Sequence, residues 1–168
     1  MTALPASANL GLVVRRLDPA SESDRAHLVA LTDAYARDPM GGGDGLSEHA
    51  RAHLAEAFAA HPATFALLAE RNGEPVGLAL CVLGFSSFYA APTVNLHDIS
   101  VTPQARGTGV GRALLAAVEA EGSARGCAKV TLEVRPDNRV GRQLYESQGF
   151  ELSALGGAAY LMMEKKLV

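Results

Sequence analysis

One stretch of the chain decides the fold: Val101-Thr102-Pro103-Gln104-Ala105-Arg106-Gly107-Thr108-Gly109-Val110-Gly111-Arg112. It follows a segment typical of a strand, Val94 to Val101, and opens an apolar pattern with helical spacing, Gly107 to Arg125. The three alternating glycines leave backbone N–H groups open to close approach. Because the first amides of a helix have no internal partner and lie at the positive end of its dipole, the turn predicts an anion site suited to a phosphate or diphosphate.

Two common phosphate loops do not fit this turn. The dinucleotide pattern GxGxxG fails because Arg112 stands at its third glycine, and the pattern GxxxxGK fails because no lysine follows these glycines. Arg106 and Arg112 add positive charge beside the turn. A tight turn that merely tolerates glycine is the alternative, but each glycine inside a helix costs about 0.8–1 kcal/mol.

Strand and helix signals continue on both sides of the turn. We expect strands over Leu10–Asp18, Thr64–Glu70, Val76–Phe88, Val94–Val101, Lys129–Arg135, Phe150–Leu155 and Tyr160–Leu167. We expect helices from Ser21 to Asp38, from Ser47 to Pro62, over Gly107–Arg125 and over Arg139–Gln148. The turn signals Asn72-Gly73 and Gly156-Gly157 predict two hairpins. The order β-αα-βββ-α-β-α-ββ predicts a mixed α/β fold, with about seven mostly antiparallel strands in one sheet and helices on both faces.

Composition sets the broad class. The chain has 168 residues, 48% of them hydrophobic, which predicts one domain over 10–168 after a flexible tail, 1–9. The net charge of −3 argues against nucleic-acid and membrane partners. Cys81 and Cys127 form no CxxC motif, so a reducing, cytoplasmic location fits best. No apolar run approaches the ~18 residues of a membrane span, and the start lacks the basic region of a signal peptide.

The glycine turn and a second motif together resemble a known family. Gln104-x-x-Gly107-x-Gly109, extended by Gly111, follows Leu96-His97-Asp98-Ile99-Ser100-Val101 and is similar to the acetyl-CoA signature of the GNAT N-acetyltransferase superfamily. Downstream, Asn138, Leu144-Tyr145-Glu146 and Gly149-Phe150 match that superfamily's N…LYE…GF element, although Gly141 stands where the family usually has alanine. The resemblance runs from about Leu10 to the end of the chain.

The resemblance implies how acetyl-CoA, as co-substrate, would lie. Its pantetheine arm would contact the main chain of Ile99 and Val101 in a gap between two splayed strands. Its diphosphate would be held by the turn, that is by Arg106, Gly107, Thr108, Gly109, Val110, Gly111 and Arg112. Asn138 would bind the pantetheine or the phosphate end, and it also fits as the cap of the following helix.

The resemblance also suggests catalytic residues for acetyl transfer to an amine. An alkylamine of pKa ~10.4 must lose a proton before it attacks, and His97, with an ordinary pKa of ~6.5, takes the position of the base. His97 and Asp98, as neighbours in a strand, are expected on opposite faces, with His97 on the face of Ile99 unless a bulge intervenes. Asp98 would orient His97 or bind the amine. Tyr145 would protonate the leaving thiolate. The alternatives are a structural histidine and a tyrosine that only packs under the sheet.

Acceptor selection is expected in the segment after the first helix. Asp38 and Asp44 favour a cationic amine, and Phe88 supplies an apolar wall or a dimer contact; ordinary surface roles are the alternative. His49 and His53 have helical spacing but no third ligand, so we expect no metal. The overall prediction is an N-acetyltransferase for a small primary amine such as a polyamine or amino-acid derivative, loosely similar to the diamine-type members, and a homodimer. The alternatives are a non-catalytic acyl-CoA sensor and an enzyme that acetylates a protein N-terminus or lysine.

Overall fold

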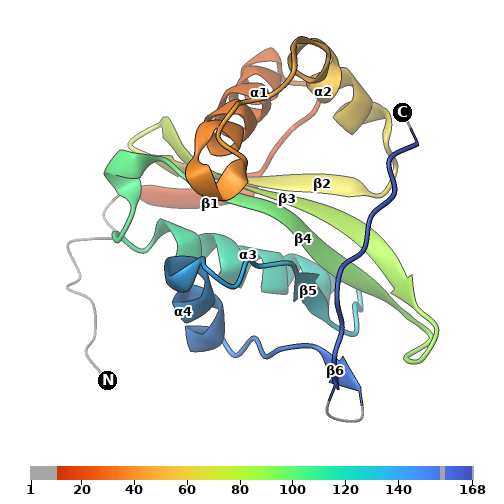
Figure 1. Ribbon diagram of the computed structural model, residues 1–168. Helices are drawn as coiled ribbons and strands as arrows, with labels where there is room; N and C mark the ends of the chain where they lie inside the picture. The colour runs from red at the N-terminus through yellow and green to blue at the C-terminus, as the bar shows by residue number, and fades with distance from the viewer. Residues whose placement is uncertain (1–10, 156–157, 168) are drawn as a thin grey trace.

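The computed structural model describes residues 11–155 and 158–167, so the expected tail 1–9 and the Gly156-Gly157 turn lie outside the described residues. The elements follow the expected order (Figure 1). The helices are α1 (Glu22–Arg37), α2 (Glu48–Ala60), α3 (Val110–Ala124) and α4 (Arg139–Ser147), with short 3-10 turns η2 (Pro39–Gly41) and η3 (Pro103–Ala105). The strands are β1 (Leu12–Arg16), β2 (Thr64–Arg71), β3 (Glu74–Ser86), β4 (Ala91–Val101), β5 (Val130–Leu132), β6 (Ala154–Leu155) and β7 (Ala158–Ala159). The mixed α/β fold is therefore confirmed.

The main sheet has five strands in the order β1-β2-β3-β4-β5, not the seven expected. The first four pair antiparallel, and β5 pairs parallel with β4 over only three positions, Val94 to Leu96. β6 and β7 form a separate two-residue pair, and residues 160–167 are extended but belong to no strand. The expected hairpin does not join the sheet, where the last strand, β5, offers an edge of only three residues, Val130–Leu132.

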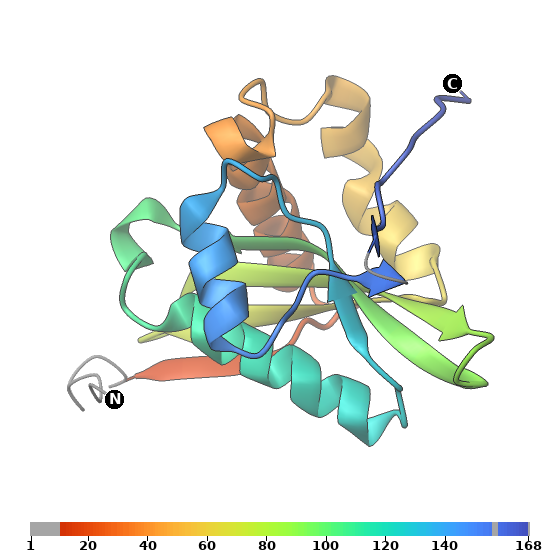
Figure 2. The same ribbon diagram turned by 60° about the horizontal axis from the view of Figure 1, so that its bottom comes forward.

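Two helical layers enclose the sheet (Figures 1 and 2). α3 covers one face, where Leu114, Leu115 and Val118 are buried against Phe65 and Val94. α1 and α2 cover the other, where the buried core consists of Leu17, Leu28, Leu31, Phe58, Ala66, Leu68, Leu78 and Leu80. α4 lies on the α3 side and contributes Tyr145 to that core. The expected helices on both faces are confirmed.

The local start and stop signals act as the side-chain chemistry predicts. Ser21 caps α1, with its hydroxyl accepting from the Asp24 amide at 3.3 Å, and Ser47 caps α2 by accepting from the Ala50 amide at 3.1 Å. At the β2–β3 hairpin, Asn72 and Gly73 have φ of 53° and 84°, which is the conformation that this dipeptide tolerates.

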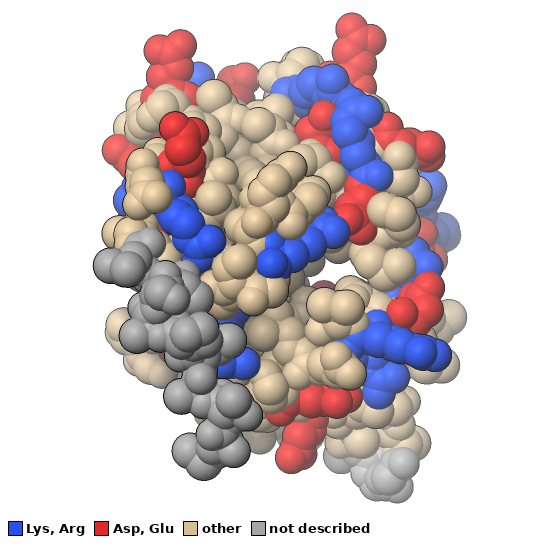
Figure 3. All heavy atoms as spheres, turned by 90° about the vertical axis from the view of Figure 1, so that its left-hand side faces the viewer, with Lys and Arg blue, Asp and Glu red and all other residues tan. Residues whose placement is uncertain are grey.

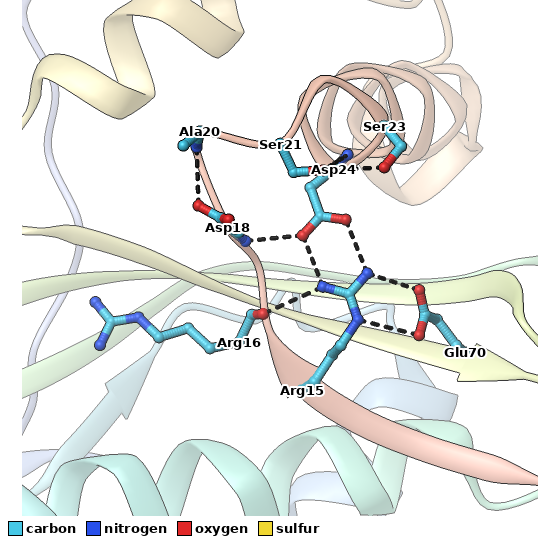
Figure 4. Close-up of polar contacts among 8 residues, drawn as sticks. All are labelled: Arg15, Arg16, Asp18, Ala20, Ser21, Ser23, Asp24 and Glu70. Atoms are coloured by element: carbon cyan, nitrogen blue, oxygen red, sulfur yellow. Dashed lines mark hydrogen bonds and ion pairs between the residues drawn. The ribbon is translucent and has the colours of Figure 1, made fainter.

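A buried ion pair fastens the first helix to the sheet (Figure 4). The Arg15 guanidinium on β1 donates to both oxygens of Asp24 on α1, at 2.6 and 2.8 Å, and to Glu70 on β2 at 2.7 and 3.1 Å. Asp24 is 2% exposed and also accepts from the Asp18 amide at 2.8 Å. Arg15 holds the pKa of Asp24 down to about 2 against the cost of burial, so this carboxylate stays charged in the folded chain.

Candidate active site

A bulge in β4 marks the site. Leu80 of β3 pairs with Asp98, and the next residue, Cys81, pairs with Leu96, so His97 is the extra residue that has no partner. β4 and β5 also stop pairing at Leu96, so the two parallel strands separate beyond this point. The bulge and the divergence therefore coincide, and the β5-side edge of β4 beyond Leu96 has no ladder partner in residues 11–155 and 158–167.

The bulge changes which faces the expected catalytic residues occupy. Ile99 and Val101 pack on the α3 side, and Asp98, opposite Leu80, faces the α1–α2 side. The bulge allowed for in the sequence expectation is therefore present, and alternation along β4 does not place His97 on the face of Ile99. His97 Nδ1 lies 3.2 Å from Asp98 Oδ2, and the side chains are 62% and 29% exposed. The carboxylate is thus placed to orient the imidazole directly, in contact with solvent.

The structure explains the glycines of the turn in two different ways. Gly107 and Gly109 have φ of 73° and 91°, which other residues adopt only with strain, and a Cβ on Gly107 would meet open space. Gly111 is helical, and a Cβ there would lie 3.0 Å from Leu144 Cδ2, so this glycine lets α4 pack closely on α3. Only two of the three glycines are therefore needed for the backbone conformation of the turn.

The start of α3 is suited to an anion. Gly109 is its N-cap, and no side chain caps the helix start within the described residues. The Thr108 hydroxyl donates to the Ala105 carbonyl at 2.6 Å, and Arg71 at the end of β2 donates to that hydroxyl at 2.9 Å. Arg71 is a basic residue beside the turn that sequence analysis missed, because only the sheet pairing brings the β2 end to this loop.

Basic side chains gather at this end of the molecule. Arg106 and Arg112 are both exposed beside the turn. The face on the left of Figure 1, which carries the turn and α4, is hollowed, and some Lys and Arg side chains lie near the hollow among uncharged and acidic ones (Figure 3). A diphosphate fits this combination of uncapped helix amides, open space at Gly107 and nearby guanidinium groups.

Tyr145 and Asn138 come from α4 and its start. Tyr145 is 8% exposed, its ring packs edge-on to Phe150 with centroids 6.1 Å apart, and burial, followed by the influence of Tyr35, raises its pKa to about 12. Asn138 caps α4, because its Oδ1 accepts from the Gly141 amide at 2.9 Å. A Cβ on Gly141 would lie 2.7 Å from the Asn138 side chain, which explains the glycine at this position.

Tyr35 lies close to the same site. In the sequence it continues an apolar stripe at helical spacing with Leu28 and Leu31, which indicates only a core position. It is half-buried, and its pKa is raised first by burial and then by the charges of Asp98 and Asp38, while Arg135 lowers it. These influences require Tyr35 to lie within electrostatic range of both carboxylates. Its coupling to Tyr145 connects the α1 side of the sheet with the α4 side. No sequence signal distinguishes Tyr35 from its apolar neighbours on the stripe.

The structure separates the expected acceptor residues. Asp38 lies against the turn, where its Oδ2 accepts from Arg106 Nη2 at 2.8 Å and its Oδ1 from the Met40 amide at 2.9 Å. Asp44 is exposed in the segment between α1 and α2. Phe88 is 95% exposed and precedes β4, whereas the glycine turn follows the other end of that strand, so these two are not brought together.

Three comparisons identify the relatives of this chain. Residues 28–150 match the family model described as the acetyltransferase (GNAT) family. The uncharacterised N-acetyltransferase YhfO of Bacillus subtilis (strain 168) is 33% identical over 132 residues, which cover 79% of this chain and 87% of YhfO.

Two solved structures share the fold at low sequence identity. A ribosomal-protein-alanine N-acetyltransferase from Brucella melitensis biovar Abortus 2308 superposes with a TM-score of 0.68 at 21% identity, covering 91% of this chain and 99% of that one. AAC(6')-Iy in complex with the bisubstrate analogue CoA-S-monomethyl-acetylneamine has a TM-score of 0.72 at 21% identity, covering 92% and 98%. With the family match and the curated relative, they show that this chain belongs to the GNAT family of acetyltransferases and is an acyltransferase enzyme.

Proposed function

We propose that this enzyme transfers an acetyl group from acetyl-CoA to a primary amine by direct attack. One observation carries the proposal: the uncapped start of α3 and the divergence of β4 from β5 meet at the same end of the sheet, with Tyr145 on one side and Asp98 on the other. An anion site beside a gap between strands suits a long ligand that is anionic at one end and reactive at the other.

The residues that would hold acetyl-CoA follow from this placement. The main-chain amides from Gly107 to Gly111 and the guanidinium groups of Arg106 and Arg112 would take the diphosphate. The unpaired edge of β4 at Ile99 and Val101 would bind the pantetheine amides, and Asn138 would contribute beside its role as helix cap. Bound acetyl-CoA supplies a thioester carbonyl, whose oxygen gains negative charge as the amine attacks, and backbone N–H groups stabilise such charge.

The chain's own titratable groups divide into a base and an acid. His97, oriented by Asp98 at 3.2 Å, would accept the proton of the incoming ammonium group, directly or through water. Tyr145, whose pKa is about 12, stays protonated at neutral pH and would donate its proton to the departing thiolate, whose own pKa is ~8.5. Tyr145 therefore has a proton to donate at neutral pH, and its raised pKa makes it a weaker acid than an ordinary tyrosine.

A small cationic amine is the acceptor that we favour. Asp98 faces the α1–α2 side, and no arginine within residues 11–155 and 158–167 pairs with it, whereas Asp38 is paired with Arg106. Aminoglycoside N-acetyltransferases among the structural relatives act on small polar amines, which supports this class. A protein N-terminus is the second candidate, favoured by the Brucella relative named for a ribosomal-protein alanine.

Release of free thiol from acetyl-CoA across a panel of amines tests the proposal. The panel contains polyamines, amino-acid amides, an aminoglycoside and an N-terminal peptide, and coenzyme A binding is titrated in parallel by calorimetry. We expect turnover of a polyamine or amino-acid derivative above the others. Turnover of only the peptide would reject a small cationic amine as the acceptor. Turnover of only the aminoglycoside would reject a polyamine or amino-acid derivative within that class, and binding with no turnover of any amine would favour a sensor.

We also propose a homodimer in a reducing, cytoplasmic compartment. Cys81 and Cys127 are free, which supports the compartment. Tyr160, Leu161, Met162 and Met163 are 66% to 89% exposed in succession, and such an apolar surface favours contact with a second copy. Light scattering measures the mass directly, and a monomer at working concentration would overturn the dimer. No helix within residues 11–155 and 158–167 has both the length and the apolar character to cross a membrane.

A further inference from the structure

Asp38 is engaged in a way that an amine-binding carboxylate would not be. Its Oδ1 accepts from the Met40 amide at 2.9 Å and so caps the short η2 turn, and its Oδ2 accepts from Arg106 at 2.8 Å. The side chain is 19% exposed. With both oxygens used and the charge matched by a guanidinium, Asp38 has little capacity left for a substrate cation.

The Asp38 contact fixes Arg106 from one side. Arg106 Nε donates to the Val101 carbonyl at 3.1 Å, and Nη2 donates to Asp38. These donors lie on the same edge of the planar guanidinium, so the end formed by Nη1 and the second Nη2 hydrogen is left for another acceptor. Arg106 directly precedes Gly107 in the chain, so its guanidinium is tethered to the glycine turn, and a fork of N–H groups matches a phosphate.

The segment between α1 and α2, residues 38–47, is held from a second direction. Arg135 Nη1 donates to the Pro39 carbonyl at 3.4 Å, and Asp137 holds the same guanidinium at 3.0 and 2.7 Å. Arg106 follows β4 and Arg135 follows β5. Asp38 and Pro39, two adjacent residues of this segment, therefore contact the chain that follows the ends of both β4 and β5.

We propose that Asp38 is a positioning residue for the diphosphate of acetyl-CoA, which holds Arg106 ready for that ligand and thereby couples residues 38–47 to occupation of the glycine turn. The inference rests on the proposed function and assigns to Asp38 a role different from amine recognition. Holding the long arginine side chain in place before binding removes part of the entropy cost of ordering it. The same carboxylate caps η2. One side chain therefore contacts both the segment between α1 and α2 and the arginine beside the glycine turn.

A double-mutant cycle on coenzyme A affinity tests the coupling. Calorimetry measures the Kd of the full chain, of Asp38→Ala, of Arg106→Ala and of the double variant. An exposed ion pair contributes up to ~1 kcal/mol, so we expect Asp38→Ala to raise the Kd about fivefold in the parent and less than twofold in the Arg106→Ala background. Glu121→Ala is the matched control, because it also removes a carboxylate that pairs with an arginine, here Arg125 at the other end of α3. We expect its Kd for coenzyme A to equal that of the parent.

A second ligand separates positioning from general disruption. Pantetheine lacks the diphosphate, so Asp38→Ala leaves its weaker binding unchanged, whereas a collapsed site would lose both ligands. Asp38→Asn keeps an acceptor for Arg106 and the η2 cap, and we expect it to recover most of the coenzyme A affinity. If Asp38→Ala fails to fold, Asp38→Ser replaces it in the cycle, because its shorter, uncharged side chain keeps an acceptor for the Met40 amide but loses the ion pair with Arg106.

The outcomes distinguish this inference from the function on which it rests. No heat with coenzyme A in the parent protein refutes the proposed function and the inference together. Binding by the parent with an equal or lower Kd in Asp38→Ala refutes the positioning role alone, because it shows that the carboxylate is neutral or competes with the diphosphate for Arg106. An equal loss of coenzyme A affinity with and without Arg106 also refutes the positioning role, because Asp38 would then act independently of Arg106.

Discussion

Replacing Asp24 by asparagine tests the physical account of how the first helix is held. The carboxylate is 2% exposed and accepts from Arg15 and from the Asp18 amide (Figure 4). Its pKa is about 2 in the folded chain, against an ordinary 3.8. That difference corresponds to about 2 kcal/mol of folding stability, carried by the charged form.

The sign follows from the direction of the shift. A depressed carboxylate pKa contributes stability that is fully present above the unfolded-state pKa of 3.8 and is lost as the pH falls toward about 2. We therefore expect the free energy of unfolding of the parent protein to fall between pH 5 and pH 2 by about 2 kcal/mol more than that of Asp24→Asn. At pH 7 the variant is less stable by at least that amount, because Arg15 loses a charged partner.

Urea unfolding followed by circular dichroism at a series of pH values measures both quantities. The other carboxylates titrate in both proteins and cancel in the difference. Asp44→Asn, at an exposed position, is the matched control and keeps the pH dependence of the parent. Equal pH dependence in the parent and Asp24→Asn would refute the claim that the Arg15 pair keeps this buried carboxylate charged.

Further predictions concern the site. Tyr145→Phe lowers kcat, measured by thiol release, by about 10²-fold at neutral pH, and it leaves the Kd for coenzyme A, measured by calorimetry, unchanged. An unchanged kcat would show that Tyr145 is not the acid. Gly109→Ala, at φ 91°, costs about 1 kcal/mol in urea unfolding, and an unaltered stability would show that the turn is unstrained. Gly111→Ala places a Cβ 3.0 Å from Leu144 Cδ2, so thermal denaturation shows a lower Tm unless α4 moves freely.

The sequence predicted those features that local chemistry determines. Ser21 and Ser47 cap helices because a hydroxyl before an amphipathic run satisfies a free amide, and Asn72-Gly73 turns because both residues tolerate positive φ. The strand–glycine turn–helix unit was predictable for the same reason. These signals extend over a few residues, so no knowledge of the sheet was needed.

Features that depend on tertiary pairing were not predictable. The bulge at His97 arises from the register between β3 and β4, so alternation along β4 could not place this side chain. Arg71 and Tyr35 reach the site only through the packing of β2 and α1. The Gly156-Gly157 signal predicted a closing hairpin, but joining the sheet also needs a neighbouring strand, and β5 is only three residues long.

The central claim is that backbone amides just past Pro103 hold the diphosphate of the acetyl donor. An amide proton–nitrogen NMR titration with coenzyme A, beside a matched titration with pantetheine, tests it most directly. The account predicts that the amides of Gly107, Gly109 and Gly111 shift strongly with coenzyme A and stay in place with pantetheine, while Ile99 shifts with both. Coenzyme A binding that leaves those three glycine amides unmoved would contradict it.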